Sequence, residues 1–307
     1  LMGLNLDWKR FVTHQVVDFV KAERDAVKAV DPSIPCTTNF MYYHNDYNYF
    51  KFKDELDVIC WDAYPQWRGG NNAKLASIYG LWHDAMRSIK RQPFLLMEST
   101  PSTANWWPVS KLKKPGQHRM SSMQAVAHGS NSVQYFQFRK SRGAFEKFHG
   151  AVIAHSGSGE TRVFKECSQL GAELKALGTQ TLGADNPAQV GILFDWDNYW
   201  ALEYTSGPTV DLKYVDQIHQ YYRYFYDKHI PVDMVPVDGD FSKYQVIVAP
   251  VLYMVKEGMA EVLERFVENG GTLVTGFMSG IVDQSDNVHL GGYPGPLRKM
   301  CGIWAEE

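Results

Sequence analysis

Apolar residues form two patterns along the first part of the chain, a helical spacing and short continuous runs. Over residues 5–30 they recur at three- and four-residue spacing, which predicts a long amphipathic helix that ends at Asp31 and Pro32. Short apolar runs bounded by turn residues then predict strands that alternate with helices. The predicted strands cover residues 36–41, 57–61, 93–97 and 132–138, and the predicted helices cover residues 73–91, 117–129 and 160–177. This alternation predicts a parallel sheet, either doubly wound or part of a barrel.

The same alternation begins again after a linker-like segment at residues 183–187. The strands predicted beyond it cover residues 190–194, 232–235, 246–249 and 272–275, and the helices cover residues 209–228 and 257–269. This order is typical of a Rossmann-like or flavodoxin-like sheet. The hydrophobic pattern therefore predicts an α/β protein with two domains, divided between residues 182 and 183.

The distribution of charge supports this division. Residues 1–180 carry 23 Lys and Arg against 16 Asp and Glu, whereas residues 181–307 carry 8 against 18. The basic residues of the first part are scattered among carboxylates and aromatic residues, so nucleic acid is not expected as a partner. No run of 18 uncharged apolar residues occurs, so no membrane partner is expected.

The cysteines and the first residues exclude other classes of protein. Four cysteines without a CxxC motif or close spacing argue against a disulfide scaffold and against a zinc ribbon. The segment Leu1–Leu4 has no basic region followed by an apolar region, so it does not resemble a secretory signal. Unless the start of the protein precedes residue 1, a cytoplasmic location is expected.

Polar side chains lie near or just after the C-terminal end of each of the first four predicted strands, at Asn39, Asp62, Glu98 and Arg139. In a (β/α)₈ barrel the active site is built at these carboxyl ends. Glu98 follows four apolar residues, and a carboxylate in such a place is expensive to bury unless it is functional or paired. Catalysis by Glu98 and a structural ion pair with Arg139 or another basic residue at the same edge of the sheet both remain open on this pattern alone.

Other candidate side chains lie in the loops of the same part of the chain. Trp106 and Trp107 could stack on the apolar face of a sugar or close the hydrophobic core as a lid. Asp62 could serve as a second acid or form a turn before a proline. Glu146 and His149 could bind substrate hydroxyl groups or form a surface pair, and the further ligands that a metal site would need are not found at a recognisable spacing.

Several chemistries lack their motifs in the second part of the chain. No GxSxG, Walker or GxGxxG sequence occurs, and the loop after residues 190–194 begins Asp195-Trp-Asp197, whose charge would repel a dinucleotide phosphate. The turn after Thr275 holds no cysteine nucleophile, which argues against an amidotransferase-like enzyme.

Long segments of the chain resemble the glycoside hydrolase family 42 β-galactosidases. In the first domain the segments are NFM (39–41), ELDVICWDAYP (55–65), LLMEST-P (95–101), NWWPVSKLKKPGQHRMSSMQAVAHGS (105–130) and SVQYFQFRKSRGAFEKFHGAV (132–152). In the second domain VGILFDWDNYWALE (190–203), ENGGTLVTGF (268–277) and GGYPGPLRKMCGIW (291–304) are similar to the family's flavodoxin-like trimerisation module.

The resemblance implies a fold and a set of site residues. Residues 1–182 would form the C-terminal half of a (β/α)₈ barrel, strands five to eight, and residues 183–307 would form a flavodoxin-like trimerisation domain that is incomplete at its C-terminus. The family hydrolyses terminal β-D-galactosides with retention, and Glu98 matches its nucleophile. The residues that match its galactose-binding positions are Asp62, Trp106, Glu146, His149 and Phe52.

The resemblance also implies that the chain is an internal piece of a longer protein. The family's acid/base glutamate and the zinc cysteines of some members belong to the part that precedes residue 1, so no metal or cofactor is expected here and the chain alone would be catalytically incomplete. A homotrimer that binds a galactoside is expected. A sugar-binding or assembly module without catalysis is the alternative.

Overall fold

The computed structural model describes residues 2–42, 44–67, 70–184 and 186–306, which form two compact units. The first unit combines residues 1–34 and 43–55 with residues 187–307, and the second combines residues 35–42 with residues 56–186. Asp185 of the predicted linker lies outside the described residues. The predicted domain boundary between residues 182 and 183 stays a prediction.

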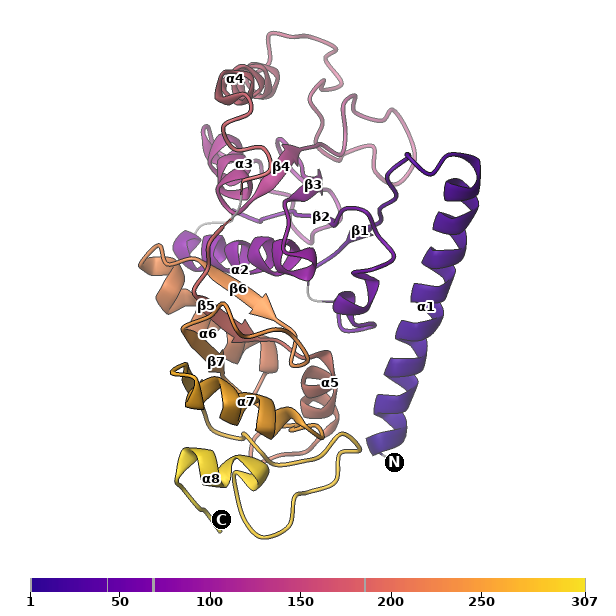
Figure 1. The fold of residues 1–307 in the computed structure, drawn as a ribbon. Coiled ribbons are helices and arrows are strands. Elements are labelled where there is room, and N and C mark those ends of the chain that lie inside the picture. The colour runs from indigo at the N-terminus through magenta and orange to yellow at the C-terminus, as the bar shows by residue number, and fades with distance from the viewer. Residues whose placement is uncertain (1, 43, 68–69, 185, 307) are drawn as a thin grey trace. The chain divides into compact units, whose positions relative to one another are not determined.

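A four-stranded parallel sheet in the order β1-β2-β3-β4 forms the centre of the second unit (Figure 1). Its strands are β1 (Asn39–Phe40), β2 (Cys60–Asp62), β3 (Phe94–Glu98) and β4 (Ser130–Val133), and its helices are α2 (Asn72–Lys90), α3 (Gln117–Ala127) and α4 (Arg162–Leu177). Consecutive strands are neighbours, as they are in a segment of a (β/α)₈ barrel, and helices α2 and α3 connect β2 to β3 and β3 to β4. The predicted order of strands and helices is confirmed.

The register between β2 and β3 brings two carboxylate residues to neighbouring positions. Asp62 is paired with Glu98 across the ladder, after a shift in register between Trp61 and Asp62. Because both strands run in the same direction, their carboxyl ends lie at the same edge of the sheet. The ladder continues one residue further, where the Ala63 amide donates to the Glu98 carbonyl oxygen at 2.9 Å.

The fourth strand differs from its predicted extent, residues 132–138. Strand β4 covers Ser130–Val133, and the chain beyond it leaves the regular ladder while still bonding to the segment that follows β3. The Phe136 amide donates to the Ser99 carbonyl oxygen at 2.9 Å. Inside the ladder, the Leu96 amide donates to the Ser130 hydroxyl at 3.0 Å, so a side chain replaces a backbone acceptor.

A second parallel sheet, in the order β6-β5-β7-β8, forms the centre of the first unit. Its elements are β5 (Val190–Leu193), α5 (Trp196–Tyr204), α6 (Tyr214–Asp227), β6 (Val232–Val235), β7 (Val246–Ala249), α7 (Met259–Glu268) and β8 (Thr272–Thr275), followed by η2 (Gly295–Leu297) and α8 (Arg298–Cys301). The order of the strands is that of a flavodoxin-like sheet, as expected from the sequence.

Helix α5 was not predicted, because the charged sequence after β5 is typical of a loop. Asp195 is the N-cap of this helix, and its side chain accepts a hydrogen bond from the Asp197 amide at 3.3 Å. Lys256 lies 3.0 Å from Asp195 and 2.8 Å from Asp197, so both carboxylates are paired. The two acids therefore stabilise the start of a helix instead of a loop.

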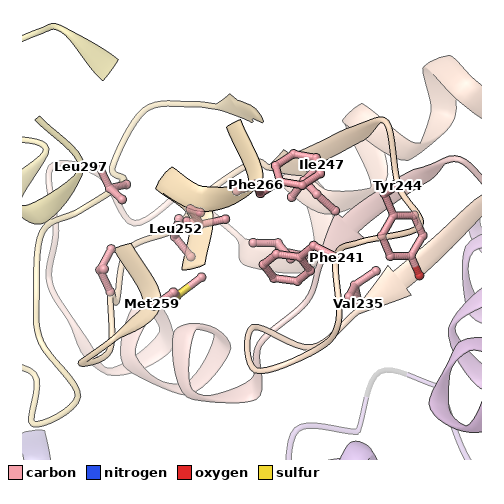
Figure 2. Packing of buried hydrophobic residues seen from close by; sticks show 12 residues of the cluster. Val235, Phe241, Tyr244, Ile247, Leu252, Met259, Phe266 and Leu297 are labelled. Carbon is pink, nitrogen blue, oxygen red and sulfur yellow. The ribbon is translucent and has the colours of Figure 1, made fainter. Parts of the chain in front are cut away.

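Buried apolar residues between this sheet and α7 form the core of the first unit. Figure 2 shows Phe241 near the middle of this cluster, with Leu297 at one end and Tyr244 at the other. The rings of Phe241 and Phe266 meet edge to face, with centroids 6.3 Å apart. A fully buried side chain of this size contributes about 1.5–3 kcal/mol to folding. At Gly191 a Cβ atom would lie 2.8 Å from Ile247 Cδ1, so the packing requires glycine there.

Helix α1 (Met2–Val30) confirms the long helix predicted at the start of the chain (Figure 1). Its buried residues are Leu6 and Thr13, and Arg10 pairs with Asp197 at 3.1 Å. Large apolar side chains on the same helix are exposed, among them Trp8 at 61% and Phe19 at 62%. The apolar stripe that the periodicity predicts is therefore exposed along much of the helix.

None of the four cysteines, all of which lie among the described residues, forms a disulfide; Cys60 and Cys167 are buried, and Cys36 and Cys301 are half-buried. Among the described residues, no helix has both the length and the apolar composition needed to cross a bilayer.

Candidate active site

Glu98 ends strand β3 at the carboxyl edge of the first sheet, where its side chain is half-buried. The Tyr64 hydroxyl donates a hydrogen bond to Glu98 Oε2 at 2.5 Å. Arg139 is exposed, and the described residues include no ion pair between it and Glu98. A neutral phenol therefore orients the Glu98 carboxylate through one of its two oxygens, and the structural ion pair considered for this residue is not present in the described structure.

Asp62 ends the neighbouring strand β2 and is 2% exposed. Its Oδ2 atom accepts a hydrogen bond from Asn39 Nδ2 at 2.6 Å, whereas its Oδ1 atom is buried with no hydrogen-bond partner among the described residues. Burial raises the pKa of Asp62 to about 6, with a smaller contribution from the negative charge of Glu98, and the hydrogen bond from Asn39 opposes this rise. The second oxygen of Asp62 is thus left to accept a hydrogen bond from a ligand.

Tyr64 connects the two carboxylates to the aromatic part of the site. Its ring meets Trp106 edge to face with centroids 5.4 Å apart, and it meets His149 in the same way at 5.6 Å. Burial raises the pKa of Tyr64 far above its usual value, and the hydrogen bond to Glu98 and the charges of nearby carboxylates act in the same direction. The phenol therefore remains a hydrogen-bond donor throughout the neutral pH range.

The tryptophan pair lies in the loop after β3. Trp106 is 38% exposed, and its ring lies 4.8 Å from that of Trp107 at an angle of 32°. Asn105 Nδ2 donates to the Phe145 carbonyl oxygen at 2.9 Å, which ties this loop to the segment that carries Glu146. A partly exposed ring beside the carboxylates is suited to stacking on a sugar.

His149 is fully buried, with its ring packed edge to face against Phe136 at 4.9 Å. Its Nδ1 atom lies 3.1 Å from the Gly150 carbonyl oxygen, and because a carbonyl can only accept, Nδ1 carries the hydrogen. The Nε2 atom is buried and has no partner among the described residues. Glu146 is half-buried, and its carbonyl oxygen accepts from the His149 amide at 2.9 Å.

The structure brings Asp62, Glu98, Trp106 and His149 together within one compact unit, with Glu146 on the adjoining segment. Phe52 belongs to the other compact unit, where its ring is buried and lies 5.6 Å from that of Tyr47. Its expected place in a sugar pocket stays a prediction.

Two residues of the site were missed as functional residues. Tyr64 lies two positions after Asp62, and residues two apart on an extended chain point to the same side, so this spacing could have identified it. Asn39 was noted at a strand end, but its contact with Asp62 depends on the pairing of β1 with β2.

The arrangement fits a polyhydroxylated ligand better than a metal ion. Buried Asp62 Oδ1 and His149 Nε2 offer acceptors for hydroxyl groups beside an exposed indole. Among the residues with described positions, no group of three His, Cys, Asp or Glu side chains is placed to hold a metal. The hydrogen bond from Tyr64 engages Oε2 of Glu98, and a carboxylate oriented in this way can act as a nucleophile.

Comparison with known proteins gives matches along almost the whole chain. Residues 1–177 match a family model described as beta-galactosidase, glycoside hydrolase family 42, and residues 188–307 match a model described as the beta-galactosidase trimerisation domain. The chain is 51% identical over 313 residues to beta-galactosidase Pbg of Clostridium perfringens, which covers 100% of the chain and 45% of that protein. It is 49% identical over 307 residues to beta-galactosidase BglY of Alicyclobacillus acidocaldarius, covering 99% and 44%.

Solved structures show the same similarity. A cold-adapted beta-galactosidase from Rahnella sp. R3 matches with a TM-score of 0.97 at 49% identity, covering 100% of this chain and 46% of that one. A beta-galactosidase from Bacillus circulans sp. alkalophilus matches with a TM-score of 0.95 at 49% identity, covering 100% and 45%. The chain thus spans about half the length of the curated relatives and solved structures that it matches.

Proposed function

Because the chain belongs to the glycoside hydrolase family 42 β-galactosidases, we propose that it is part of an enzyme that hydrolyses terminal β-D-galactosides with retention of configuration. The observation that carries the proposal is the placement of Glu98 at a strand end, oriented by Tyr64 and paired in register with buried Asp62. A carboxylate held in this way can attack an anomeric carbon.

In this mechanism Glu98 attacks the anomeric carbon of the galactoside and the bond to the leaving oxygen breaks, so a galactosyl ester forms on its carboxylate. A second carboxyl group, about 5–5.5 Å away, donates a proton to the leaving oxygen and then activates the water that hydrolyses the ester. We assign that acid/base group to the part of the protein that this chain does not cover. The chain alone would then bind substrate without completing the reaction.

The remaining residues of the site bind the galactose. Asp62 Oδ1 and His149 Nε2 accept hydrogen bonds from sugar hydroxyl groups, and Glu146 supplies a further acceptor. Trp106 stacks on the apolar face of the ring. We assign no metal ion or cofactor to the part of the protein that this chain covers.

Replacing Tyr64 with phenylalanine is expected to lower kcat about 10- to 100-fold with a smaller change in KM. The phenylalanine keeps the ring contacts with Trp106 and His149 but removes the hydrogen bond to Glu98, which is worth about 1.5–3 kcal/mol because it involves a charged group. Steady-state kinetics with a nitrophenyl β-D-galactoside measure both constants. An unchanged kcat would show that the hydrogen bond does not orient the nucleophile.

The second domain assembles the enzyme. Residues 188–307 match a trimerisation domain, and we assign a homotrimer to the complete protein. We place the enzyme in the cytoplasm. We assign it neither a membrane nor a nucleic acid partner.

The proposal is tested with the complete enzyme, meaning this chain joined to the part that its relatives carry beyond it. Proton NMR of a nitrophenyl β-D-galactoside during hydrolysis is expected to show β-galactose as the first product, because two successive inversions restore the starting configuration. First-formed α-galactose would contradict the retaining mechanism. Galactose binding without turnover would instead support the non-catalytic sugar-binding or assembly module.

A further inference from the structure

Lys113 is a buried lysine with no role in the mechanism described above. Its side chain is enclosed in the second compact unit, and the residue is 5% exposed. The ammonium group donates a hydrogen bond to the Thr100 carbonyl oxygen at 2.6 Å, and the Lys113 amide donates to the Ser102 carbonyl oxygen at 2.8 Å. Both acceptors belong to the segment that directly follows Glu98.

This segment, residues 99–104, also contacts the part of the chain that carries His149. The Gly150 amide donates to the Thr103 carbonyl oxygen at 2.7 Å. A Cβ atom at Gly150 would lie 2.3 Å from Thr100 Oγ1 and 2.7 Å from the Thr103 carbonyl oxygen, so this close approach requires glycine. Residues 99–104 therefore lie between Glu98 and the loop of Trp106 and also contact the segment of His149. Lys113 binds the backbone of this segment at Thr100.

The charge of Lys113 makes this contact costly for folding. Among the described residues no carboxylate forms an ion pair with it, and burial lowers the pKa of Lys113 to about 8. A buried charge without an opposite charge destabilises the folded state, whereas a methionine could fill a similar volume without that cost. A role in the reaction would offset this cost to stability and would explain why an ammonium group occupies the position.

We propose that Lys113 is a positioning residue for the reaction. Its ammonium group fixes the carbonyl oxygen of Thr100 and so holds residues 99–104 in the conformation that aims Glu98 and Trp106 at the substrate. The inference rests on the proposed role of Glu98 as the nucleophile.

The titratable groups near Lys113 gain or lose their protons at pH values different from that of Lys113. His118 on α3 and Cys167 on α4 interact electrostatically with Lys113, and Tyr135 after β4 lies 3.1 Å from His118 Nε2. Arg162 donates to the Lys113 carbonyl oxygen at 3.0 Å while pairing with Glu166. Burial lowers the pKa of His118 to about 3 and raises that of Cys167 to about 11. Burial also raises the pKa of Tyr135 above its usual range.

Loss of the Lys113 proton is therefore the change that this cluster undergoes in mildly alkaline solution. The neutral amine retains weaker hydrogen bonds, so the position of residues 99–104 becomes less well defined as the pH rises through about 8.

The test replaces Lys113 with methionine in the complete enzyme, with Lys114→Met as the matched control because Lys114 is exposed. At pH 7 Lys113→Met is expected to lower kcat about tenfold and to change KM less than about threefold, since a charge-assisted hydrogen bond is lost. The ratio of native to variant kcat is expected to shrink as the pH rises through about 8, because the native enzyme then loses the same charge. The melting temperature is expected to stay the same or rise.

Each of three results would overturn the proposal. One is a native kcat in Lys113→Met, and another is a kcat ratio that does not change from about pH 6.5 to about pH 9.5. The third is a fall in melting temperature together with a kcat that returns to the native value once the rate is expressed per folded molecule, which would indicate a structural role.

If Lys113→Met does not fold, Lys113→Arg provides the second measurement. Arginine keeps its charge across this pH range, so the alkaline decline attributed to Lys113 should disappear, and its persistence would contradict the proposal. If the native enzyme hydrolyses no galactoside, the proposed function itself is rejected. If the native and Lys113→Met enzymes hydrolyse it at equal rates, only the role of Lys113 is rejected.

Discussion

Replacing Glu98 with glutamine is expected to lower the turnover of a nitrophenyl β-D-galactoside at least about 10⁴-fold in the complete enzyme, because a neutral amide cannot form the galactosyl ester. Glutamine keeps the size of the side chain and can still accept the hydrogen bond from Tyr64. The variant is therefore expected to fold and to bind galactose while losing turnover. Initial rates at saturating substrate measure the effect directly.

Adding an external nucleophile separates the role of Glu98 from a structural one. In Glu98→Ala the shorter side chain leaves space below the anomeric carbon, and azide can enter this space and attack in place of the carboxylate. Because only one inversion then takes place, the product is expected to be α-galactosyl azide. Glu160→Gln, which changes an exposed glutamate, serves as the control and should keep the native rate. Near-native turnover by Glu98→Gln would reject the nucleophile assignment.

Replacing Asp62 with asparagine is expected to lower kcat/KM about 10²- to 10³-fold. The substitution removes the charge of an acceptor whose Oδ1 atom is buried and free to bind a hydroxyl group of the sugar. In the native enzyme, Asp62 takes up a proton as the pH falls through about 6, so kcat/KM should decline there in acid. In Asp62→Asn that part of the acid decline should be missing. Profiles of kcat/KM against pH for the two enzymes measure it.

The stability of Asp62→Asn provides the control for folding. The folded state raises the pKa of Asp62 from its usual value of 3.8 to about 6, so between these values the folded chain binds more protons than the unfolded chain. The contribution of Asp62 to stability therefore falls as the pH rises from about 4 to about 6. Asp62→Asn should accordingly melt no lower than the native enzyme at neutral pH, and exposed Asp211→Asn should change neither property. A native kcat/KM in Asp62→Asn would show that this carboxylate does not bind substrate.

The sequence predicted the regular elements where the apolar period was strong. The helix over residues 5–30 and the strands at 232–235, 246–249 and 272–275 agree with α1, β6, β7 and β8. Prediction was wrong where a side chain changed the local hydrogen bonding. The Ser130 hydroxyl accepts from Leu96 inside the ladder, and Asp195 begins a helix where its charge had indicated a loop.

The candidate site was predictable in part, for a similar reason. Glu98 and Asp62 could be identified because a carboxylate after a run of apolar residues is energetically unusual. Tyr64 is not energetically unusual in this way: its position two residues after Asp62 indicates the side that it faces, but the contact of its hydroxyl group with Glu98 depends on the fold. Lys113 lies between exposed neighbours, Leu112 and Lys114, so nothing in the local pattern indicates that its ammonium group is buried.

By itself, the sequence determined the family, the alternation of strands and helices, and the acids at the strand ends, because these depend on residue type and spacing along the chain. Only the tertiary structure decided which of these groups contact one another. The register of β2 against β3 pairs Asp62 with Glu98, and the fold brings the Tyr64 hydroxyl to one carboxylate and the Asn39 amide to the other. Hydrogen bonds and desolvation act over a few ångströms, and side chains distant in sequence reach such separations only when the sheet has formed.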